Sequence, residues 1–130
     1  MDTRLDLVLA AGDLGLWDVD LIRGEVYFSD RFKELLAIPE PRFTQEFRFR
    51  NHLHPDDRDR VGAAVDAAIE SGVALDERFR FRRGDGTYGW FHATGKRFNR
   101  ADGQPERFTG VLRTIDREMT AERELRLRES

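Results

Sequence analysis

The sequence predicts an α+β fold in which a five-stranded antiparallel sheet carries its helices on one face. Turn signals at Arg23-Gly24, Asp85-Gly86 and Asp102-Gly103 separate segments in which apolar and polar residues alternate. A stretch with helical periodicity, residues 30–72, lies between the first two predicted strands and the last three. Strands grouped on both sides of a helical centre favour one layer of helices packed on one sheet.

Composition narrows the class of protein. Ten Phe in 130 residues indicate a folded core rich in rings. The 22 basic and 25 acidic residues are mixed along the chain, which argues against a basic nucleic-acid-binding face. The absence of cysteine excludes disulfides and thiolate chemistry. With no apolar run of ~18 residues and no signal-peptide pattern, we expect a cytoplasmic domain, whether or not its parent protein is membrane-anchored.

The N-terminal residues are predicted to form a helix followed by a β-hairpin. Residues 3–11 carry apolar side chains at the spacing of an amphipathic helix, and Gly12-Asp13 ends it. Residues 14–21 alternate apolar and acidic side chains, which is typical of a strand with one buried face. Residues 25–28 form the partner strand across the Arg23-Gly24 turn.

The central stretch is predicted to be helical. Ser29 or Asp30 can cap a helix over residues 31–37, because a short polar side chain accepts a hydrogen bond from the first turn. Residues 43–53 fit both a strand and short helices, and we favour short helices.

The longest helix is predicted to start at His54-Pro55, because proline suits the first helical position. Two aspartates follow in the first turn, where the helix dipole favours negative charge. Gly72 ends the helix. Its buried stripe recurs at helical spacing and consists of Val61, Val65, Ala68 and Ile69.

The C-terminal half is predicted to be β-structure followed by a helix. Residues 78–83 alternate arginine and phenylalanine, which directs the two phenylalanines to the core and the arginines to the outer face. Partner strands over residues 87–98 and 106–115 follow the two Asp-Gly turns. From Asp116 onward the chain is charged and lacks Gly and Pro, so we expect a helix that continues into a longer connector.

Five motifs, in this order and spacing, resemble the PAS family, specifically the members that contain a PAC motif. Each is weak alone, but together they cover about residues 5–125. The motifs are GLWDVD at 15–20, GEVYFS at 24–29, HPDDR at 54–58, FRFRRGDGTYGWF at 79–91, and GV at 110–111 followed by AEREL at 121–125.

The resemblance implies a sensory domain of a bacterial multidomain signalling protein, without catalytic activity of its own. It divides the chain into an N-terminal cap helix (1–13), a PAS core (14–116) and the start of a signalling helix (117–130). A small-molecule, redox or protein input would reach an output domain, a histidine kinase or a cyclic-di-GMP enzyme such as a diguanylate cyclase, through this helix. The signal would leave the core through Thr114, Ile115 and Asp116.

The exit junction departs from the family pattern. The family usually has Asp-Ile-Thr where the last strand becomes the helix, and this chain has Thr114-Ile115-Asp116. Because aspartate caps a helix as well as threonine does, we expect Asp116 to cap the exit helix.

The inward-facing side chains could line a ligand pocket or simply fill the core. Small-molecule sites are mostly apolar. Protein interiors are normally close-packed, however, so a filled core is the simpler interpretation. The candidate pocket residues are Trp17, Phe28, Phe32, Leu36, Val65, Ile69, Phe79, Phe81, Phe91 and Phe108.

No cofactor is expected, and the protein should fold without one and be colourless. Similar PAS domains hold haem through a histidine on the long helix, but residues 55–71 contain no histidine. The flavin photochemistry of light-oxygen-voltage PAS domains needs a cysteine, so only non-covalent flavin or another small molecule stays open. His52, His54, Asp56 and Asp57 are metal-ligand types, but helix capping explains this motif more simply.

A weak homodimer is the expected assembly. Leu5, Val8 and Leu9 form an apolar stripe on the N-terminal helix that could cover the outer face of its own sheet or that of a second copy, and symmetric dimers are the commonest oligomers. We expect no contact with nucleic acid or membrane. Two alternatives stay open: a ligand-free dimerisation module, and a small cone-shaped α+β enzyme that uses His92 with an Asp as its acid–base pair.

Overall fold

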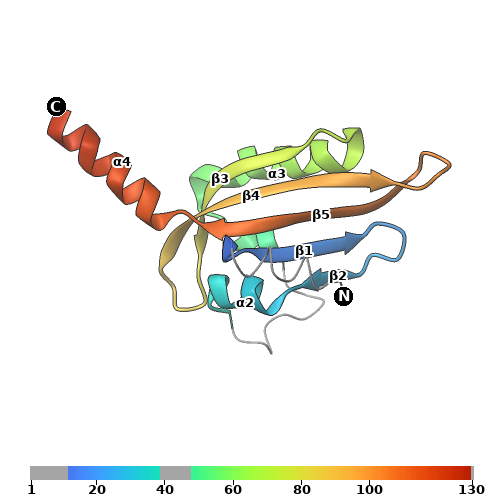
Figure 1. Ribbon diagram of the computed structural model, residues 1–130, viewed down its shortest axis with the longest axis horizontal. Helices are drawn as coiled ribbons and strands as arrows, with labels where there is room; N and C mark the ends of the chain where they lie inside the picture. Colours follow the sequence, from blue (N-terminus) through green and yellow to red (C-terminus); the bar gives the residue numbers. More distant parts are fainter. Residues whose placement is uncertain (1–11, 39–47, 130) are drawn as a thin grey trace.

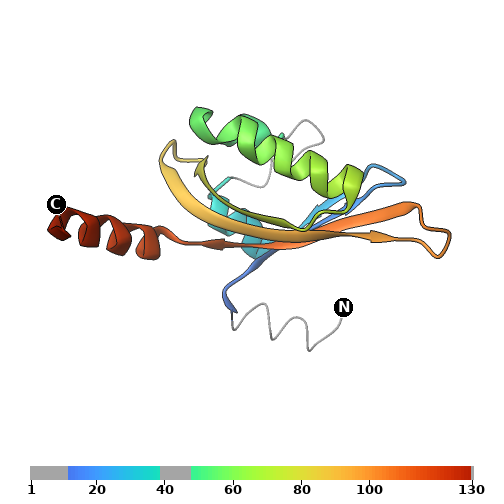
Figure 2. The same ribbon diagram turned by 90° about the horizontal axis from the view of Figure 1, so that it is seen from above.

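The computed structural model describes residues 12–38 and 48–129, which adopt the predicted class of fold. The described strands join in one antiparallel sheet of order β2-β1-β5-β4-β3, with helices on one face and α4 leaving the body at the end of β5 (Figures 1 and 2). The elements are β1 (Gly15–Asp20), β2 (Val26–Phe28), α2 (Asp30–Leu36), the 3-10 helix η2 (Phe49–His52), α3 (Pro55–Ser71), β3 (Leu75–Arg82), β4 (Tyr88–Asn99), β5 (Pro105–Thr114) and α4 (Asp116–Glu129).

Two predicted segments lie wholly or partly outside the described residues. The N-terminal helix, with Leu5, Val8 and Leu9, is one of them. Of the predicted short helices over residues 43–53, the described part contains η2. In the described residues, no helix is both long and apolar enough to cross a membrane.

Strand β3 begins three residues earlier than the alternation of Arg and Phe suggests. Leu75 is buried at its start. Asp76 and Glu77 interrupt the apolar pattern but have polar partners on neighbouring elements: the Asp76 carboxylate contacts the His92 ring, and Glu77 forms an ion pair with Arg60. Each carboxylate therefore has a partner, and the strand accommodates both residues.

Helix α2 is fixed to the sheet by its capping residue. The Ser29 hydroxyl accepts hydrogen bonds from the amide of Phe32 (3.2 Å), inside the helix, and from the amide of Leu16 (2.9 Å), in β1. Gly15 lets the helix approach, because a Cβ at this position would lie 2.6 Å from the Cα of Phe32. The predicted cap and buried face are confirmed, with Phe32, Leu35 and Leu36 buried.

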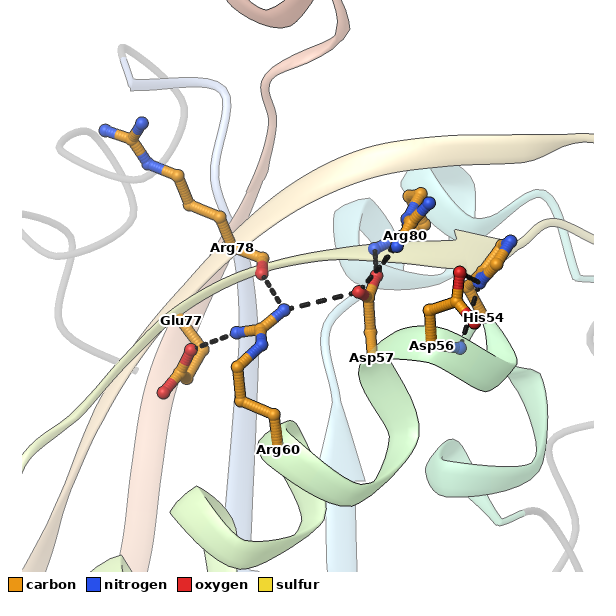
Figure 3. Close-up of polar contacts among 7 residues, drawn as sticks. All are labelled: His54, Asp56, Asp57, Arg60, Glu77, Arg78 and Arg80. Carbon is orange, nitrogen blue, oxygen red and sulfur yellow. Dashed lines mark hydrogen bonds and ion pairs between the residues drawn. The ribbon is translucent and has the colours of Figure 1, made fainter.

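Strand β3 is an edge strand, and the start of α3 covers its free edge (Figure 3). The amide of His54 donates to the carbonyl of Arg80 (2.9 Å). Asp57 then accepts three hydrogen bonds from Arg80: from its amide (2.8 Å), from Nε (3.0 Å) and from Nη2 (2.8 Å). Uncovered edge strands invite pairing with other chains, so this docking both places α3 and protects the sheet.

The next turn of α3 extends the same docking. Arg60 Nη2 donates to the carbonyl of Arg78 (2.9 Å), and its other terminal nitrogen forms an ion pair with Glu77 (Figure 3). Arg60 also lies 3.4 Å from the Asp57 carboxylate. The HPDDR motif thus both begins a helix and binds that helix to a strand edge.

Asp57 is ionised in this setting although it is buried. Burial opposes ionisation, but the hydrogen bonds from Arg80 and the positive charges of Arg80 and Arg60 outweigh it, and they lower the pKa of Asp57 from 3.8 to about 2. The Arg80 guanidinium also lies over the Trp90 ring, 5.1 Å from its centroid. Arg80 is therefore half-buried on the outer face, held between a carboxylate and an indole.

Replacement of Asp57 by alanine should lower the free energy of unfolding by about 3 kcal/mol, because it leaves the Arg80 amide and guanidinium without their acceptor. Asp56→Ala is the matched control, since its side chain is 75% exposed in the same helical turn and should cost less than about 1 kcal/mol. Urea unfolding followed by circular dichroism measures both. Equal losses in the two variants would contradict this role for Asp57.

Stability should also fall in acid because of Asp57. Its folded-state pKa lies below its ordinary value, so its contribution is fully present above about pH 4 and is lost as the pH falls towards 2. The difference corresponds to about 2 kcal/mol. Unfolding free energies between pH 5 and pH 2 should therefore fall more steeply for the wild type than for Asp57→Asn. Parallel curves would contradict the assignment, whatever the other carboxylates contribute.

Candidate functional site

A cavity of about 440 Å³ lies between the inner face of the sheet and helix α3. This volume falls in the lower part of the ~300–1,000 Å³ range of small-molecule sites. The walls are mainly apolar, and a few polar side chains come from η2 and β3. The lining residues are Trp17, Val19, Val26, Phe28, Phe32, Arg48, Phe49, Arg50, Asn51, Val61, Val65, Ile69, Leu75, Glu77, Phe79, Ala93, Phe108 and Leu112.

Most of the candidate pocket residues line this cavity, so the core is not filled throughout. Val65 and Ile69 are half-buried because they face it. The candidates that line the cavity are Trp17, Phe28, Phe32, Val65, Ile69, Phe79 and Phe108.

Leu36, Phe81 and Phe91 lie instead in the packed part of the core, each 0% exposed. Phe81 is two residues nearer the β3–β4 turn than Phe79, where Leu53 pairs with it and Phe49 packs on its ring at 5.0 Å. The sheet is therefore packed at the hairpin end and open further along.

The sequence reasoning missed several lining residues. Leu75, Ala93 and Leu112 share strand parity with phenylalanines already predicted to face inward, so alternation alone could have identified them. Arg50 and Asn51 come from η2, a segment whose pattern was ambiguous.

One row of residues across all the described strands forms the floor of the cavity. Register places Phe28 beside Trp17, Trp17 beside Gly110, Gly110 beside Gly95, and Gly95 beside Leu75. The Trp17 indole lies over both glycines, and its ring packs edge-on against Phe108 with centroids 5.8 Å apart. The floor is thus largely aromatic, with the indole in place of the missing glycine side chains.

Two of the charged side chains that line the cavity, Arg50 and Glu77, are compensated within the protein. Arg50 binds the two carboxylate oxygens of Asp66 at 2.5 and 3.4 Å. Glu77 pairs with Arg60. Because these ions already have partners, the cavity favours an uncharged ligand over an ionic one.

The strand that crosses the cavity floor leads directly into α4. Ile115 is buried between them, and its amide donates to the carbonyl of Trp90 (2.9 Å). The Asp116 carboxylate accepts from the amide of Trp90 (2.8 Å) and forms an ion pair with Arg83. The Thr114 hydroxyl donates to Asp116 Oδ2 (3.3 Å). The first turn of α4 is thereby attached to the β3–β4 hairpin.

The capping role predicted for Asp116 is corrected by these contacts. Its two carboxylate oxygens are directed to the hairpin, because Arg83 and the Trp90 amide lie within reach at the end of β5. Burial raises the pKa of this carboxyl, but the hydrogen bonds from Trp90 and Arg83 and the charge of Arg83 outweigh it, so the net pKa is lowered. An ionised Asp116 therefore joins the start of α4 to strand β4 and to the β3–β4 turn.

The residues considered as metal ligands have separate partners. His52 stacks on a core phenylalanine with ring centroids 5.2 Å apart, and His54 Nδ1 accepts from the amide of Asp56 (3.1 Å). Asp57 is occupied by the edge strand. Among residues 12–38 and 48–129, no group of three or more His, Cys, Asp or Glu side chains is placed to hold a metal ion.

His92 does have an aspartate partner, although not at the cavity. Its Nε2 lies 2.5 Å from Asp76 Oδ1, and its Nδ1 lies 3.3 Å from Arg113 Nη2. Its neighbours Phe91 and Ala93 face the core, so His92 lies on the outer face. The sheet separates this pair from the cavity.

The sequence model described as the PAS fold matches residues 25–112. This chain belongs to the PAS family. The sensor protein FixL of Bradyrhizobium diazoefficiens is 31% identical over 117 residues, a match that covers 90% of this chain and 23% of FixL. The PAS domain thus spans less than a quarter of the length of that relative.

Solved structures show the same fold. A sensory box histidine kinase/response regulator from Burkholderia thailandensis aligns with a TM-score of 0.81 and 28% identity, over 97% of this chain and 95% of that one. The N-terminal domain of a diguanylate cyclase with a PAS/PAC sensor from Marinobacter aquaeolei aligns with a TM-score of 0.74 and 20% identity, over 82% and 98%. A light-oxygen-voltage domain studied with a flavin analogue aligns with a TM-score of 0.71 and 18% identity, over 100% and 98%.

Removal of the Asp116 charge should destabilise the first turn of α4. Asp116→Asn loses the ion pair with Arg83, so amide exchange over residues 115–120 should become at least several-fold faster, with a loss of about 1–2 kcal/mol in stability. Glu122→Gln is the control, because its partner Arg126 lies within α4 itself. Hydrogen exchange with mass spectrometry measures both variants. Unchanged exchange in Asp116→Asn would refute the anchoring role.

Proposed function

We propose that this PAS domain is a non-catalytic sensory module that binds a compact, uncharged apolar molecule in its cavity. The change would pass through β5 and α4 to a covalently linked output domain. The observation that carries the proposal is the continuity of β5: Leu112 lines the cavity, and two residues further on Thr114 contacts the anchor of α4. A shift in the cavity floor therefore has a short covalent path to the helix.

The cavity itself supports a small-molecule input over a redox or protein input. Its lining is apolar and aromatic, and two of its charged side chains, Arg50 and Glu77, have protein partners. Binding of an apolar ligand to such a surface is favoured by the burial of apolar area, whereas a charged ligand would be buried without a partner for its charge. That folding needs no cofactor stays a prediction, which rests on the absence of cysteine from the chain and of histidine from residues 55–71.

The exit helix supports transmission to a following domain. In Figure 1, α4 projects away from the sheet, and its Leu125 and Leu127 are 55% and 66% exposed. Relatives of this domain belong to a sensor protein, a histidine kinase and a diguanylate cyclase. A histidine kinase or a cyclic-di-GMP enzyme is accordingly the proposed output, with residues 1–13 as cap, 14–116 as sensor core and 117–130 as signalling helix.

The homodimer is part of the same proposal. Leu16, Trp90 and Val111 are half-buried on the outer sheet face, where an apolar stripe of a second copy could pack. The stripe expected to do so, Leu5, Val8 and Leu9, lies outside the described residues, so the weak dimer stays a prediction. An enzyme built on His92 is less well supported, because Arg113 contacts its second nitrogen and the cavity lies on the opposite face.

Filling the cavity should abolish ligand binding. Toluene is a suitable compact probe, and its binding can be followed by calorimetry. In Val65→Phe the larger side chain enters the cavity, so affinity should fall at least tenfold. Ala63→Phe is the matched control, because Ala63 lies on the exposed side of the same helix. Equal toluene affinities in the two variants, or no binding by the wild type, would overturn the proposal that this cavity is the binding site.

A further inference from the structure

Two paired glycines leave a trough in the inner face of the sheet, and Trp17 fills it. Gly110 of β5 pairs with Trp17 on one side and with Gly95 on the other. A Cβ at Gly95 would lie 2.6 Å from the indole, its nearest neighbour. A Cβ at Gly110 would lie 2.4 Å from the indole and 2.2 Å from the Thr94 carbonyl, so strand backbone and indole both crowd that position. Real Cβ atoms do not approach so closely, so both positions must lack a side chain while the indole lies there.

The filled trough sets the depth of the cavity. Trp17 is 8% exposed and lines the cavity, as do Phe28, its partner in β2, and Leu75, which pairs with Gly95 at the far end of the glycine trough. The opposite wall is α3. A ligand in the cavity therefore contacts the indole and not the strand backbone. The indole occupies the space over Gly95 and Gly110, so the ligand cannot enter it.

We propose that Trp17 is a specificity-determining residue that limits the cavity to compact apolar molecules and excludes flat multi-ring ones. This rests on the proposed function only in taking the cavity as a binding site. If the indole is removed, the trough becomes a flat apolar slot one ring deep, floored by Gly95 and Gly110. A planar fused-ring molecule can then lie on the sheet where the indole lay, because the glycines offer no side chain to obstruct it.

Two neutral probes of different size test the limit. Toluene represents compact ligands, and N-phenyl-1-naphthylamine, which fluoresces in apolar surroundings, represents flat multi-ring ones. Wild-type protein should bind the naphthylamine at least tenfold more weakly than Trp17→Ala does, with one site per chain in the variant. Trp90→Ala is the control, because Trp90 is on the outer face, and it should behave as the wild type.

The possible results separate this inference from the proposed function. Strong naphthylamine binding by the wild type, or none by a folded Trp17→Ala, would overturn the size limit. If the wild type binds neither probe and Trp17→Ala binds the naphthylamine, the exclusion of multi-ring molecules by Trp17 stands, whereas the binding of compact ligands, and with it the proposed function, fails. Should Trp17→Ala lose its circular dichroism signal, Trp17→Leu provides the same comparison, with a smaller gain expected because leucine fills part of the trough.

A second test needs no ligand. Gly95→Ala should lower the Tm of the wild type, since the new methyl would lie 2.6 Å from the indole and 3.0 Å from the Thr109 carbonyl. In the Trp17→Ala background the closer of these contacts is gone, so the same substitution should lower the Tm by less than half as much, and it should also weaken naphthylamine binding several-fold. Equal Tm losses in both backgrounds would show that the indole does not fill the trough.

Discussion

The attachment of Asp57 to the edge of β3 determines where α3 lies, and the cavity depends on that position. The Asp57 carboxylate accepts hydrogen bonds from the strand amide of Arg80 and from two nitrogens of its guanidinium, and it remains ionised because those donors outweigh the effect of burial. Arg60 extends the attachment to the next residues of the strand. Polar contacts thus fix the first turns of α3 to the strand edge. The position of the helix does not depend on close apolar packing along its whole length, and a cavity remains between its later turns and the sheet.

Packing follows from that geometry. Near the β3–β4 hairpin the core is close-packed and excludes solvent, as an ordinary protein interior does. The residues buried there are Phe81, Phe91, Leu53 and Leu36. Further along the sheet, α3 presents Val65 and Ile69, which are too small to reach the opposite wall, and the space remains open. The core is therefore close-packed at one end and contains the cavity at the other. The chain continues into α4 from the close-packed end, where Trp90 and Arg83 bind Asp116.

Local patterns were enough to predict the elements, because alternation in the Arg-Phe strand, the Ser29 cap and the Pro55 helix start are properties of neighbouring residues. They also predicted which side chains face inward. They could not show that Phe81 packs while Phe79 lines a cavity, since that depends on Leu53, which pairs with Phe81 only in the folded chain. Asp116 is a similar case: its capping role was a reasonable local inference, but Arg83 and the Trp90 amide lie more than 20 residues away in sequence and outcompete the helix amides.

The position of β5 at the centre of the sheet has a consequence for how the protein folds during synthesis. Among the described strands, the β1–β2 hairpin joins the rest of the sheet through β5 alone, which comes much later in the chain. The hairpin therefore has no further partner strand until residues 105–114 have left the ribosome. Two-stranded hairpins are at best marginally stable alone. The β1–β2 hairpin and helix α2 therefore cannot join the sheet until β5 has been synthesised, whereas β3 and β4 can pair as soon as both have left the ribosome. Assembly of this domain is thus governed by its last strand, and the long sequence separation of the β1–β5 contacts makes that step the slow one.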